Sequence, residues 1–165
     1  MINGIFAAEY RGGIGFNGTL PWPRNHEDMK YFQELTQGHV VIMGRKTWDD
    51  PKMPKPLPDR INYVVTNRPI GHPGVRTIKG DVVQKIKEVQ EIHYDKHIFI
   101  IGGKELIEKT SILFDNLYIT HIKGNYRHDT KIQLDKFLLG FQARSARPSN
   151  DRSCTFMVYK NLFRL

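Results

Sequence analysis

The chain has few of the features that mark secreted, metal-binding or membrane proteins. Its single cysteine, Cys154, excludes an internal disulfide and any zinc site built from several thiolates, and it is typical of a reducing cytoplasm. The seven histidines are scattered without an HExxH or HxH pair, so we expect no metal site. No apolar run approaches the roughly 18 residues of a membrane span, and the first residues lack the pattern of a signal peptide. We therefore expect a cytoplasmic protein.

Charge and length limit the partners and the number of domains. The net charge of +8 leaves nucleic acids, membrane surfaces and small polyanionic ligands open. Basic residues never form a run of five or more, however, and no cluster of them is interleaved with aromatic residues, which disfavours nucleic acid. With no linker or repeat, residues 1–165 are expected to form a single domain that buries about two-thirds of the surface of the unfolded chain.

Apolar runs of strand length alternate with segments of helical periodicity. Helices are expected at 26–36, 82–92 and 104–109. Strands are expected at 2–8, 40–43, 61–65, 77–78, 98–101, 117–122, 141–145 and 154–159, the last two as an antiparallel hairpin. Strands that alternate with helices and are followed by terminal strands predict an α/β sandwich with a mixed sheet.

The segment from Lys96 to Lys109 contains the most distinctive of these junctions. Its four apolar residues, 98–101, are followed by Gly102 and Gly103 and then by the short helix. Glycines let the backbone approach a phosphate closely, and ligands of open α/β sheets bind beyond the carboxyl ends of the strands. The junction therefore predicts an anion site, with a tight turn that binds no ligand as the alternative.

The strands at 40–43 and 61–65 also end in groups that bind anions. These groups are Gly44, Arg45, Lys46, Thr47, Thr66, Asn67 and Arg68. Several such sites on one edge of a sheet suggest a ligand with several phosphates, such as a phosphorylated dinucleotide, and guanidinium groups favour a ribose 2′-phosphate. Taken singly, each basic residue is better explained as a solvated surface charge.

A glycine-rich segment matches the G-x-G-x-x-G pattern of dinucleotide-binding folds at Gly13, Gly15 and Gly18. We reject this match because the pattern requires a helix to begin within it. Pro21 and Pro23 prevent a helix at that point. The segment indicates instead a mobile loop that covers a site.

The helix expected at 26–36 carries an acid on an otherwise apolar face. Asn25 is expected to cap this helix, and Asp28, Met29 and Phe32 fall on one side of it. The alternative is that Asp28 is an ordinary acid of the first turn, favoured there by the helix dipole. The pattern alone favours this alternative.

Sequence blocks in a fixed order closely resemble those of the dihydrofolate reductase family. The blocks are Leu20-Pro21-Trp22, Asp28-x-x-Tyr31-Phe32, Val41 to Trp48, Leu57-Pro58-x-Arg60, Ile101-Gly102-Gly103 and Tyr118-Ile119-Thr120. They extend over nearly the whole chain, and their combination is specific although each block alone is weak. The resemblance implies a three-layer sandwich with a central mixed, mostly parallel sheet of about eight strands, an antiparallel C-terminal strand and helices on both faces.

The resemblance also implies hydride transfer from NADPH to 7,8-dihydrofolate with protonation of N5, and it implies a role for each site residue. Asp28 would be the buried acid that binds the pterin ring, Trp22 would hold water beside it, and Thr120 would bond to it. Arg60 would pair with the glutamate carboxylate of folate. The expected ring-binding residues are Ile5, Ala7, Met29, Phe32, Leu57 and Ile101.

By the same resemblance, the segment from Gly13 to Trp22 would form a lid over the nicotinamide. The expected NADPH-binding residues are Ala8, Ile14, Gly15, Asn17, Gly18, Thr19, Leu20, Gly44, Arg45, Lys46, Thr47, Thr66, Asn67, Arg68, Lys79, Ile101, Gly102, Gly103, Lys104, Glu105 and Leu106. The family further implies a monomer that binds dihydrofolate, including polyglutamylated forms, and antifolate inhibitors. No nucleic acid or membrane partner is expected.

A few positions depart from the family pattern. Lys104 replaces a small residue, Ile107 replaces a frequent tyrosine, and the segment 50–52 lacks the usual hydroxyl. An alternative enzyme is a reductase of the same fold that acts on a pyrimidine intermediate of riboflavin synthesis. Asp28 and Arg60 disfavour it, because they match a pterin and a glutamate tail. A basic nucleic-acid-binding module is the rival from another class.

Overall fold

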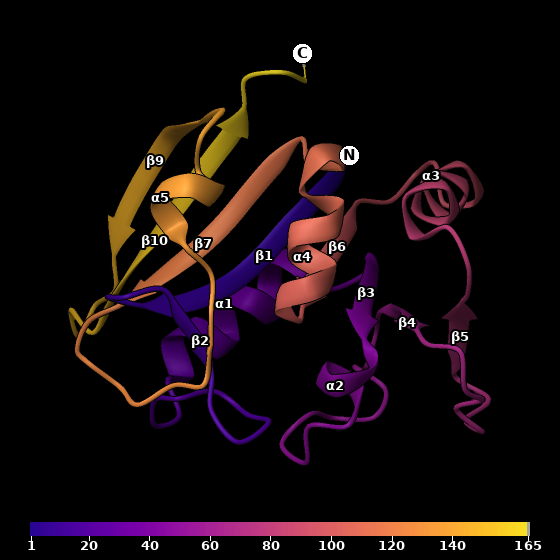
Figure 1. Cartoon of the computed structure of the whole chain (residues 1–165), viewed down its shortest axis with the longest axis horizontal. Coiled ribbons are helices and arrows are strands. Elements are labelled where there is room, and N and C mark those ends of the chain that lie inside the picture. The colour runs from indigo at the N-terminus through magenta and orange to yellow at the C-terminus, as the bar shows by residue number, and fades with distance from the viewer. Residues whose placement is uncertain (165) are drawn as a thin grey trace.

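An eight-stranded sheet forms the centre of the computed structural model, which describes residues 1–164 (Figure 1). Its strands are β1 (Ile2–Glu9), β3 (Val40–Gly44), β4 (Ile61–Val65), β5 (Val75–Ile78), β6 (Ile98–Gly102), β7 (Asn116–Ile122), β9 (Phe141–Pro148) and β10 (Cys154–Asn161). They lie in the order β5-β4-β3-β6-β1-β7-β10-β9. Neighbours from β5 to β7 are parallel, whereas β10 is antiparallel to both β7 and β9. The expected mixed, mostly parallel sheet is therefore confirmed.

The parallel strands direct their carboxyl ends to one edge of the sheet. The last residues of β3, β4, β5 and β6 are Gly44, Val65, Ile78 and Gly102. The strand β5 is longer than expected, because Val75 and Arg76 also pair with β4. The groups that the sequence predicts to bind anions follow these strands and therefore lie at this edge.

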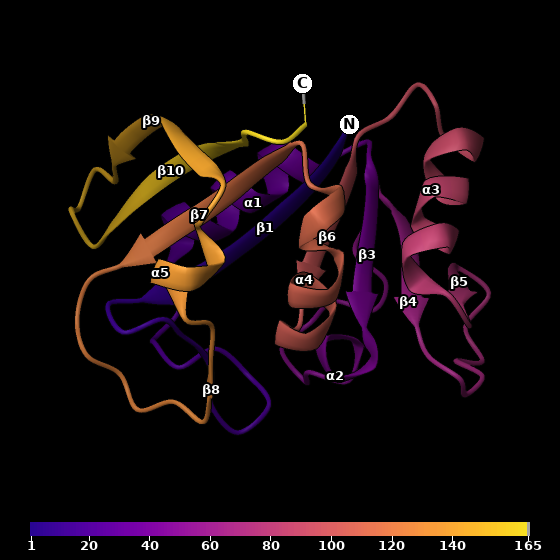
Figure 2. The ribbon, with the colours of Figure 1, turned by 45° about the horizontal axis from the view of Figure 1, so that its top comes forward.

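Helices cover both faces of the sheet, as expected. They are α1 (His26–Thr36), α2 (Arg45–Trp48), α3 (Val82–Ile92), α4 (Lys104–Thr110) and α5 (Leu134–Phe137), and a 3-10 turn, η1 (Ser111–Leu113), follows α4. In Figures 1 and 2, α1 lies behind the sheet, whereas α4 and α5 lie in front of it. The helix α3 contacts α4 and shares its buried cluster.

Local sequence explains the two longest helices, whose bounds match those expected. At the start of α1 the Asn25 side chain accepts a hydrogen bond from Asp28 N at 3.0 Å. At the start of α3 the Asp81 side chain accepts one from Gln84 N at 3.2 Å. The bounds of α2 and α5 could not be predicted from the sequence, because four residues are too few to show a helical period.

The continuous apolar strands are buried on both faces, as their composition predicted. On one face Ile42 and Ile100 pack with α3 and α4. On the other face Val41, Met43 and Phe99 pack beneath α1 and α2. This second cluster forms the floor of the site described below.

The glycine-rich segment, which the sequence indicates is a mobile loop, contains backbone pairing at its start. Its first residues form β2 (Gly13–Gly15), which pairs with β8 (Thr130–Lys131) in a second, small sheet. Phe16 and Thr19 then exchange backbone hydrogen bonds of 2.8 and 3.1 Å. The first helix begins only at His26, so the rejection of the dinucleotide motif is confirmed.

Three further observations concern residues 1–164. None of their helices is long and apolar enough to cross a membrane. Their His, Cys, Asp and Glu side chains form no group of three or more that could hold a metal ion. Cys154 is a free thiol and is fully buried.

Candidate active site

Asp28 lies in the first turn of α1 and is half-buried. The next turn of the helix directs Phe32 and Leu35 into the apolar cluster beneath it. Burial raises the pKa of Tyr31 and of the Cys154 thiol, and the nearby charge of the Asp28 carboxylate adds to both shifts. The acid therefore sits at an apolar boundary and is not an ordinary solvated residue of a first turn.

The surroundings of Asp28 change its proton affinity. Burial disfavours the charged form and raises the pKa of the Asp28 carboxyl, while a hydrogen bond from the Thr120 side chain acts in the opposite direction. Thr120 is buried on β7, where it pairs with Ala7 on one side and Phe156 on the other. An acid with a raised pKa can hold a proton nearer to neutral pH than a free aspartate can.

Four of the expected ring-binding residues gather on the face of the sheet that α1 covers. Ile5 and Leu57 belong to the buried cluster on that face, and Phe32 and Ile101 pack against it. Met29 does not join them. Its side chain is 43% exposed, and its sulfur accepts a hydrogen bond from Arg24 Nε at 3.3 Å. Met29 therefore lies at the rim of the site and not in its wall.

Trp22 lies in a neighbouring apolar cluster at the end of the lid. It is buried together with Phe156, and Ala7 packs against the same cluster. Its ring meets that of Tyr126 edge to face, with 6.4 Å between the centroids. The position agrees with a residue that closes a pocket, while the expected role in holding water stays a prediction.

The guanidinium group of Arg60 lies at the C-terminal end of α1. Its Nε donates to the Pro58 carbonyl at 2.9 Å and one terminal nitrogen donates to Thr36 Oγ1 at 3.1 Å. The group also lies 5.9 Å from the centre of the Phe32 ring. Burial lowers the pKa of Arg60, and Asp59 partly offsets this effect. The charge is therefore fixed in place next to the apolar wall.

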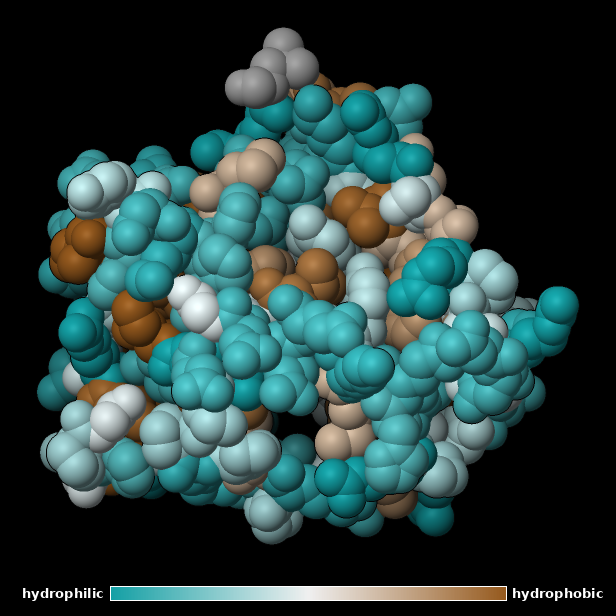
Figure 3. Space-filling view, turned by 180° about the vertical axis from the view of Figure 1, so that it is seen from behind, coloured by the Kyte–Doolittle hydropathy of each residue, from teal (hydrophilic) through white to brown (hydrophobic). Residues whose placement is uncertain are grey.

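Seen from behind, the molecule has a deep hollow low on its face (Figure 3). Figures 1 and 2 place the lid beside the loop that follows α2 in this region. The helix α1 covers the same side of the sheet and carries Asp28. The hollow and α1 therefore lie on the same side of the sheet.

Glycines bring two strand ends close together. Met43 of β3 pairs with Gly102 of β6, and a Cβ on Gly44 would lie 3.6 Å from Gly103 N. A Cβ on Gly102 would lie 3.2 Å from Thr47 Oγ1, and the φ of Gly102, +139°, is one that other residues rarely adopt. Gly44 and Gly103 are partly exposed and carry no side chain that would fill this space, which suits the close approach of a phosphate group.

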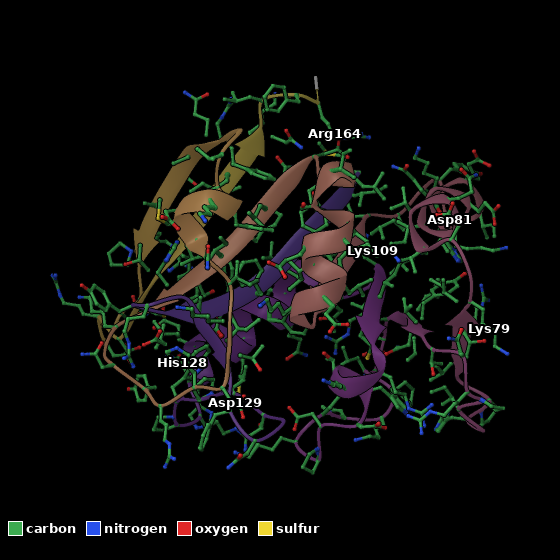
Figure 4. All side chains as sticks on the ribbon, in the orientation of Figure 1. Lys79, Asp81, Lys109, His128, Asp129 and Arg164 are labelled. Carbon is green, nitrogen blue, oxygen red and sulfur yellow. The ribbon has the colours of Figure 1, made fainter. Side chains whose placement is uncertain are left out.

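The ends of β3 and β4 are joined by their polar groups. Arg45 donates to Thr66 Oγ1 at 3.3 Å, and Arg68 N donates to the same oxygen at 3.1 Å. Lys79 lies just past β5, at the outer edge of the sheet (Figure 4). The other exposed groups on this edge are Lys46, Asn67 and Arg68. The structure thus gathers Arg45, Thr66 and Arg68, as the sequence predicted.

Three of the residues expected to bind the cofactor have side chains that are buried or packed partly against the core. Ala8 is fully buried, and Leu106 is 7% exposed and belongs to the core. Ile14 packs partly against that core. Only the backbone of Ala8 and Leu106 can meet a ligand. Ile107, where the family often has tyrosine, is likewise packed in the core.

The lid is tied to the loop before β8. Asn17 N donates to Asp129 Oδ2 at 3.0 Å, and Asp129 N donates to Gly15 O at 3.0 Å. Figure 4 shows Asp129 and His128 beside the lid. Leu20 at the end of the lid is 49% exposed. The sequence did not single out Asp129, because nothing local marks its partner in a distant loop.

Glu9 is a second residue that the sequence analysis missed. Its side chain is fully buried, and its Oε1 accepts hydrogen bonds from Arg11 N at 2.7 Å and Gly13 N at 2.8 Å. Burial opposes ionisation, but the backbone donors of Gly13, Arg11 and Tyr126 outweigh it, so the pKa of Glu9 lies below its ordinary value. A charged residue at the end of an apolar strand, three residues before Gly12, was the available signal.

Glu9→Gln is expected to weaken the hydrogen bonding around Gly13, where the lid begins. Its carbonyl can still accept from Arg11 N and Gly13 N, but its NH2 group faces Tyr126 N, which has lost its acceptor. We expect the free energy of unfolding to fall by roughly 1–3 kcal/mol, because a buried donor is left unpaired. Deuterium exchange at Tyr126 should quicken. Glu91→Gln on the exposed face of α3 is the matched control, and equal losses in both variants would contradict the assignment.

The chain is similar to known proteins in both sequence and fold. A family model described as dihydrofolate reductase matches residues 1–161. Dihydrofolate reductase type 8 of Escherichia coli is 30% identical over 146 residues, which cover 86% of this chain and 85% of that protein. Dihydrofolate reductase of Staphylococcus aureus (strain MSSA476) is 37% identical over 126 residues, which cover 76% and 74%. A solved structure of dihydrofolate reductase from Enterococcus faecalis, complexed with NADP(H) and RAB-propyl, aligns with a TM-score of 0.84 at 26% identity, covering 97% and 95%.

Proposed function

The chain belongs to the dihydrofolate reductase family, and from this premise we propose which of its residues carry the reaction. The enzyme reduces 7,8-dihydrofolate to 5,6,7,8-tetrahydrofolate, which supports one-carbon metabolism. NADPH, when bound, supplies the hydride, and N5 of the substrate takes up a proton. The protein must therefore bind and orient two ligands, exclude water and hold a proton.

The position of Asp28 is the observation that carries the proposal. Its carboxyl has a raised pKa because it is buried, and it is hydrogen-bonded by the Thr120 side chain. In the proposed site it binds the polar edge of the pterin ring and holds a proton close to the reacting nitrogen. Thr120 orients the carboxyl, and Trp22 limits the entry of water.

Arg60 would bind the opposite end of the substrate. From Asp28 to Thr36, which Arg60 contacts, α1 rises roughly 12 Å. A molecule with a heterocycle at one end and a carboxylate at the other can occupy both positions, with Ile5, Phe32, Leu57 and Ile101 along its middle. Further glutamates of a polyglutamylated substrate would extend past Arg60 toward solvent, where the net charge of +8 favours them.

The sheet edge fits the phosphates of NADPH. The backbone of Gly44, Gly102 and Gly103 would hold the pyrophosphate, since added side chains would fill this space. Arg45 and Arg68, with Thr66 between them, would bind the ribose 2′-phosphate. The remaining polar groups of the edge, Lys46, Thr47, Asn67 and Lys79, would line the adenosine. Lys104 and Glu105 would flank the pyrophosphate, and the lid residues Gly15, Asn17, Gly18 and Thr19 would line the nicotinamide.

Arg68→Ala is expected to raise KM for NADPH without raising KM for NADH. The guanidinium would lose a charge-assisted contact with the 2′-phosphate, so we expect KM for NADPH to rise on the order of tenfold to a hundredfold. KM for NADH, which lacks that phosphate, should stay within about twofold. Both values can be measured from the loss of reduced-nucleotide absorbance in the presence of dihydrofolate.

A matched control for this variant is Arg144→Ala, which removes an exposed guanidinium from β9. It should leave both KM values unchanged. If Arg68→Ala raised the two KM values equally, its guanidinium would not bind the 2′-phosphate. If the unaltered enzyme showed no oxidation of NADPH with dihydrofolate at high enzyme concentration, the proposed site would be wrong as a whole.

We further propose that the enzyme acts as a single-domain monomer in the cytoplasm and binds antifolate inhibitors in the pterin pocket. The free, buried thiol of Cys154 supports a reducing compartment. An antifolate that mimics the pterin ring would meet the same acid at Asp28, together with the walls formed by Ile5 and Phe32. Sedimentation of the purified protein tests the oligomeric state.

A further inference from the structure

The first turn of α1 is attached to a distant hairpin turn by the Asn25 side chain. Its amide oxygen accepts a hydrogen bond from Asp28 N at 3.0 Å, which is the usual action of a helix cap. Its amide nitrogen donates to Ser153 Oγ at 3.0 Å and to Cys154 Sγ at 3.8 Å. A cap needs only the oxygen, so the nitrogen makes a second, independent link between the helix and the turn before β10.

Glu27 forms a second attachment between the same two segments. Both of its carboxylate oxygens accept from Asn150 N, at 2.9 and 3.1 Å, and Arg147 lies 3.7 Å from one of them. Arg147 in turn lies 4.7 Å from the centre of the Phe156 ring. Two residues that shortly precede Asp28, Asn25 and Glu27, are therefore hydrogen-bonded to the hairpin of β9 and β10.

The hairpin turn from Ser149 to Cys154 is held by its own side chains. Asp151 Oδ1 accepts from Ser149 Oγ at 2.8 Å, Ser153 Oγ at 2.7 Å and Ser153 N at 3.0 Å. These hydrogen bonds, those of Ser153 first, lower the pKa of Asp151 to about 2. Ser149 Oγ also accepts from Cys154 N at 3.1 Å. The turn is thus a fixed point and not a flexible connection.

The hairpin also fixes the partner of Asp28. The strand β10 is antiparallel to β7, and Phe156 pairs directly with Thr120. The turn is therefore connected to Thr120 through the sheet, and to Asp28 through Asn25. Asp28 and Thr120, the pair proposed to handle the proton, are therefore both connected to the turn before β10.

We propose that Asn25 is a positioning residue for the reaction, which sets the contact between Asp28 and Thr120 by binding Ser153 with one end of its amide and the Asp28 backbone with the other. This inference rests on the proposed role of Asp28. It adds a residue that touches no ligand but determines where the acid lies.

Asn25→Ser tests the inference because serine is also a good helix cap. Its single hydroxyl can accept from the helix backbone but is too short to reach Ser153 as well. The melting temperature should therefore change little, whereas the Asp28 carboxyl should separate from Thr120. Since the Thr120 hydrogen bond lowers the pKa of Asp28, we expect a higher pKa in a carbon-13 NMR titration of labelled Asp28.

The pH dependence of kcat/KM provides the catalytic readout. In Asn25→Ser the alkaline limb should move to higher pH, together with the pKa seen by NMR, and the maximal kcat/KM should fall by roughly threefold to tenfold. Ser153→Ala removes the same link from the other side and should cause the same upward shift. An unchanged NMR pKa in both variants would overturn the inference.

A double-mutant cycle shows whether Asn25 acts through Thr120. Thr120→Val removes the hydroxyl, and Asn25→Ser should then add no further change to the pKa of Asp28. Equal shifts in both backgrounds would contradict the proposal. The matched control is Asp81→Ser, which exchanges the cap of α3, a helix that lies well apart from α1 (Figures 1 and 2). It should leave the titration of Asp28 unchanged.

The two readouts separate this inference from the proposed function. The NMR titration reports the Asp28 carboxyl whether or not that group takes part in catalysis. If Asn25→Ser moves the NMR pKa but the alkaline limb stays in place, positioning is correct and the role of Asp28 in the reaction is wrong.

Discussion

Asp28→Asn is expected to lower kcat/KM for dihydrofolate at pH 7 by about a hundredfold or more, while making the protein more stable. The amide retains the shape of the carboxyl but cannot hold or release the proton, and positioned acids typically contribute effects of this size. Activity should recover in part at low pH, where the substrate is already protonated. Steady-state assays across the pH range measure both effects.

The gain in stability follows from the sign of the pKa change. Burial raises the pKa of Asp28 in the folded protein above its unfolded value. The carboxyl therefore favours folding fully only below the unfolded pKa, and this contribution is lost as pH rises through the folded pKa. At neutral pH the ionised group opposes folding. The asparagine variant lacks this penalty, so its melting temperature should exceed that of the parent at pH 7 and match it at about pH 3.

Glu34→Gln is the matched control for the first prediction. Glu34 lies on the same helix, and its side chain is 65% exposed beside Lys30. Its replacement should change neither kcat/KM nor the melting temperature appreciably. Full activity of Asp28→Asn at pH 7 would show that another group handles the proton.

Phe114→Ala is expected to destabilise the fold more than any other change considered. Phe114 is fully buried, and its ring occupies the space over Gly4 of β1, where an added Cβ would lie 2.4 Å from Cε2. Removing the ring leaves a cavity against a strand that has no side chain to fill it. The free energy of unfolding should fall by about 3–5 kcal/mol. For a chain of this length, the melting temperature should fall by roughly 2–4 °C for each kcal/mol.

Phe163→Ala provides the comparison, because that ring is 84% exposed. Its loss should alter the free energy of unfolding by at most about 0.5 kcal/mol. Denaturant unfolding of both variants measures the difference. Similar values for the two would mean that the Phe114 site collapses on truncation, or that the ring is less tightly packed than its burial indicates.

Regular elements were predictable where short-range signals agreed. Asn25 and Asp81 mark the starts of α1 and α3, and the apolar period continues to the end of each helix. The strands at 40–44 and 98–102 were recognisable because residues buried on both faces leave no polar alternation. The pairing of β2 with β8 was not predictable, since two- and three-residue strands have no period of their own.

Some residues of the candidate site were likewise predictable from the sequence, and others were not. Arg45, Thr66 and Arg68 follow successive parallel strands, so the geometry of the sheet alone brings them to one edge, and the sequence predicted this. Glu9 and Asp129 escaped notice because their importance depends on donors in other loops. The family resemblance placed Met29 in the wall, but its side chain lies at the rim, beyond the apolar cluster on that face.

The sequence by itself determined the α/β class, the strand ends that suit phosphates and the presence of an acid on an apolar helix face. Each of these follows from residue period, capping or turn chemistry within a few neighbours. Only the tertiary structure decided that Asn25 reaches Ser153, that Asp129 binds the lid and that Glu9 is buried. These contacts join segments far apart in the chain, so they depend on the order of the strands and on which groups lose contact with water.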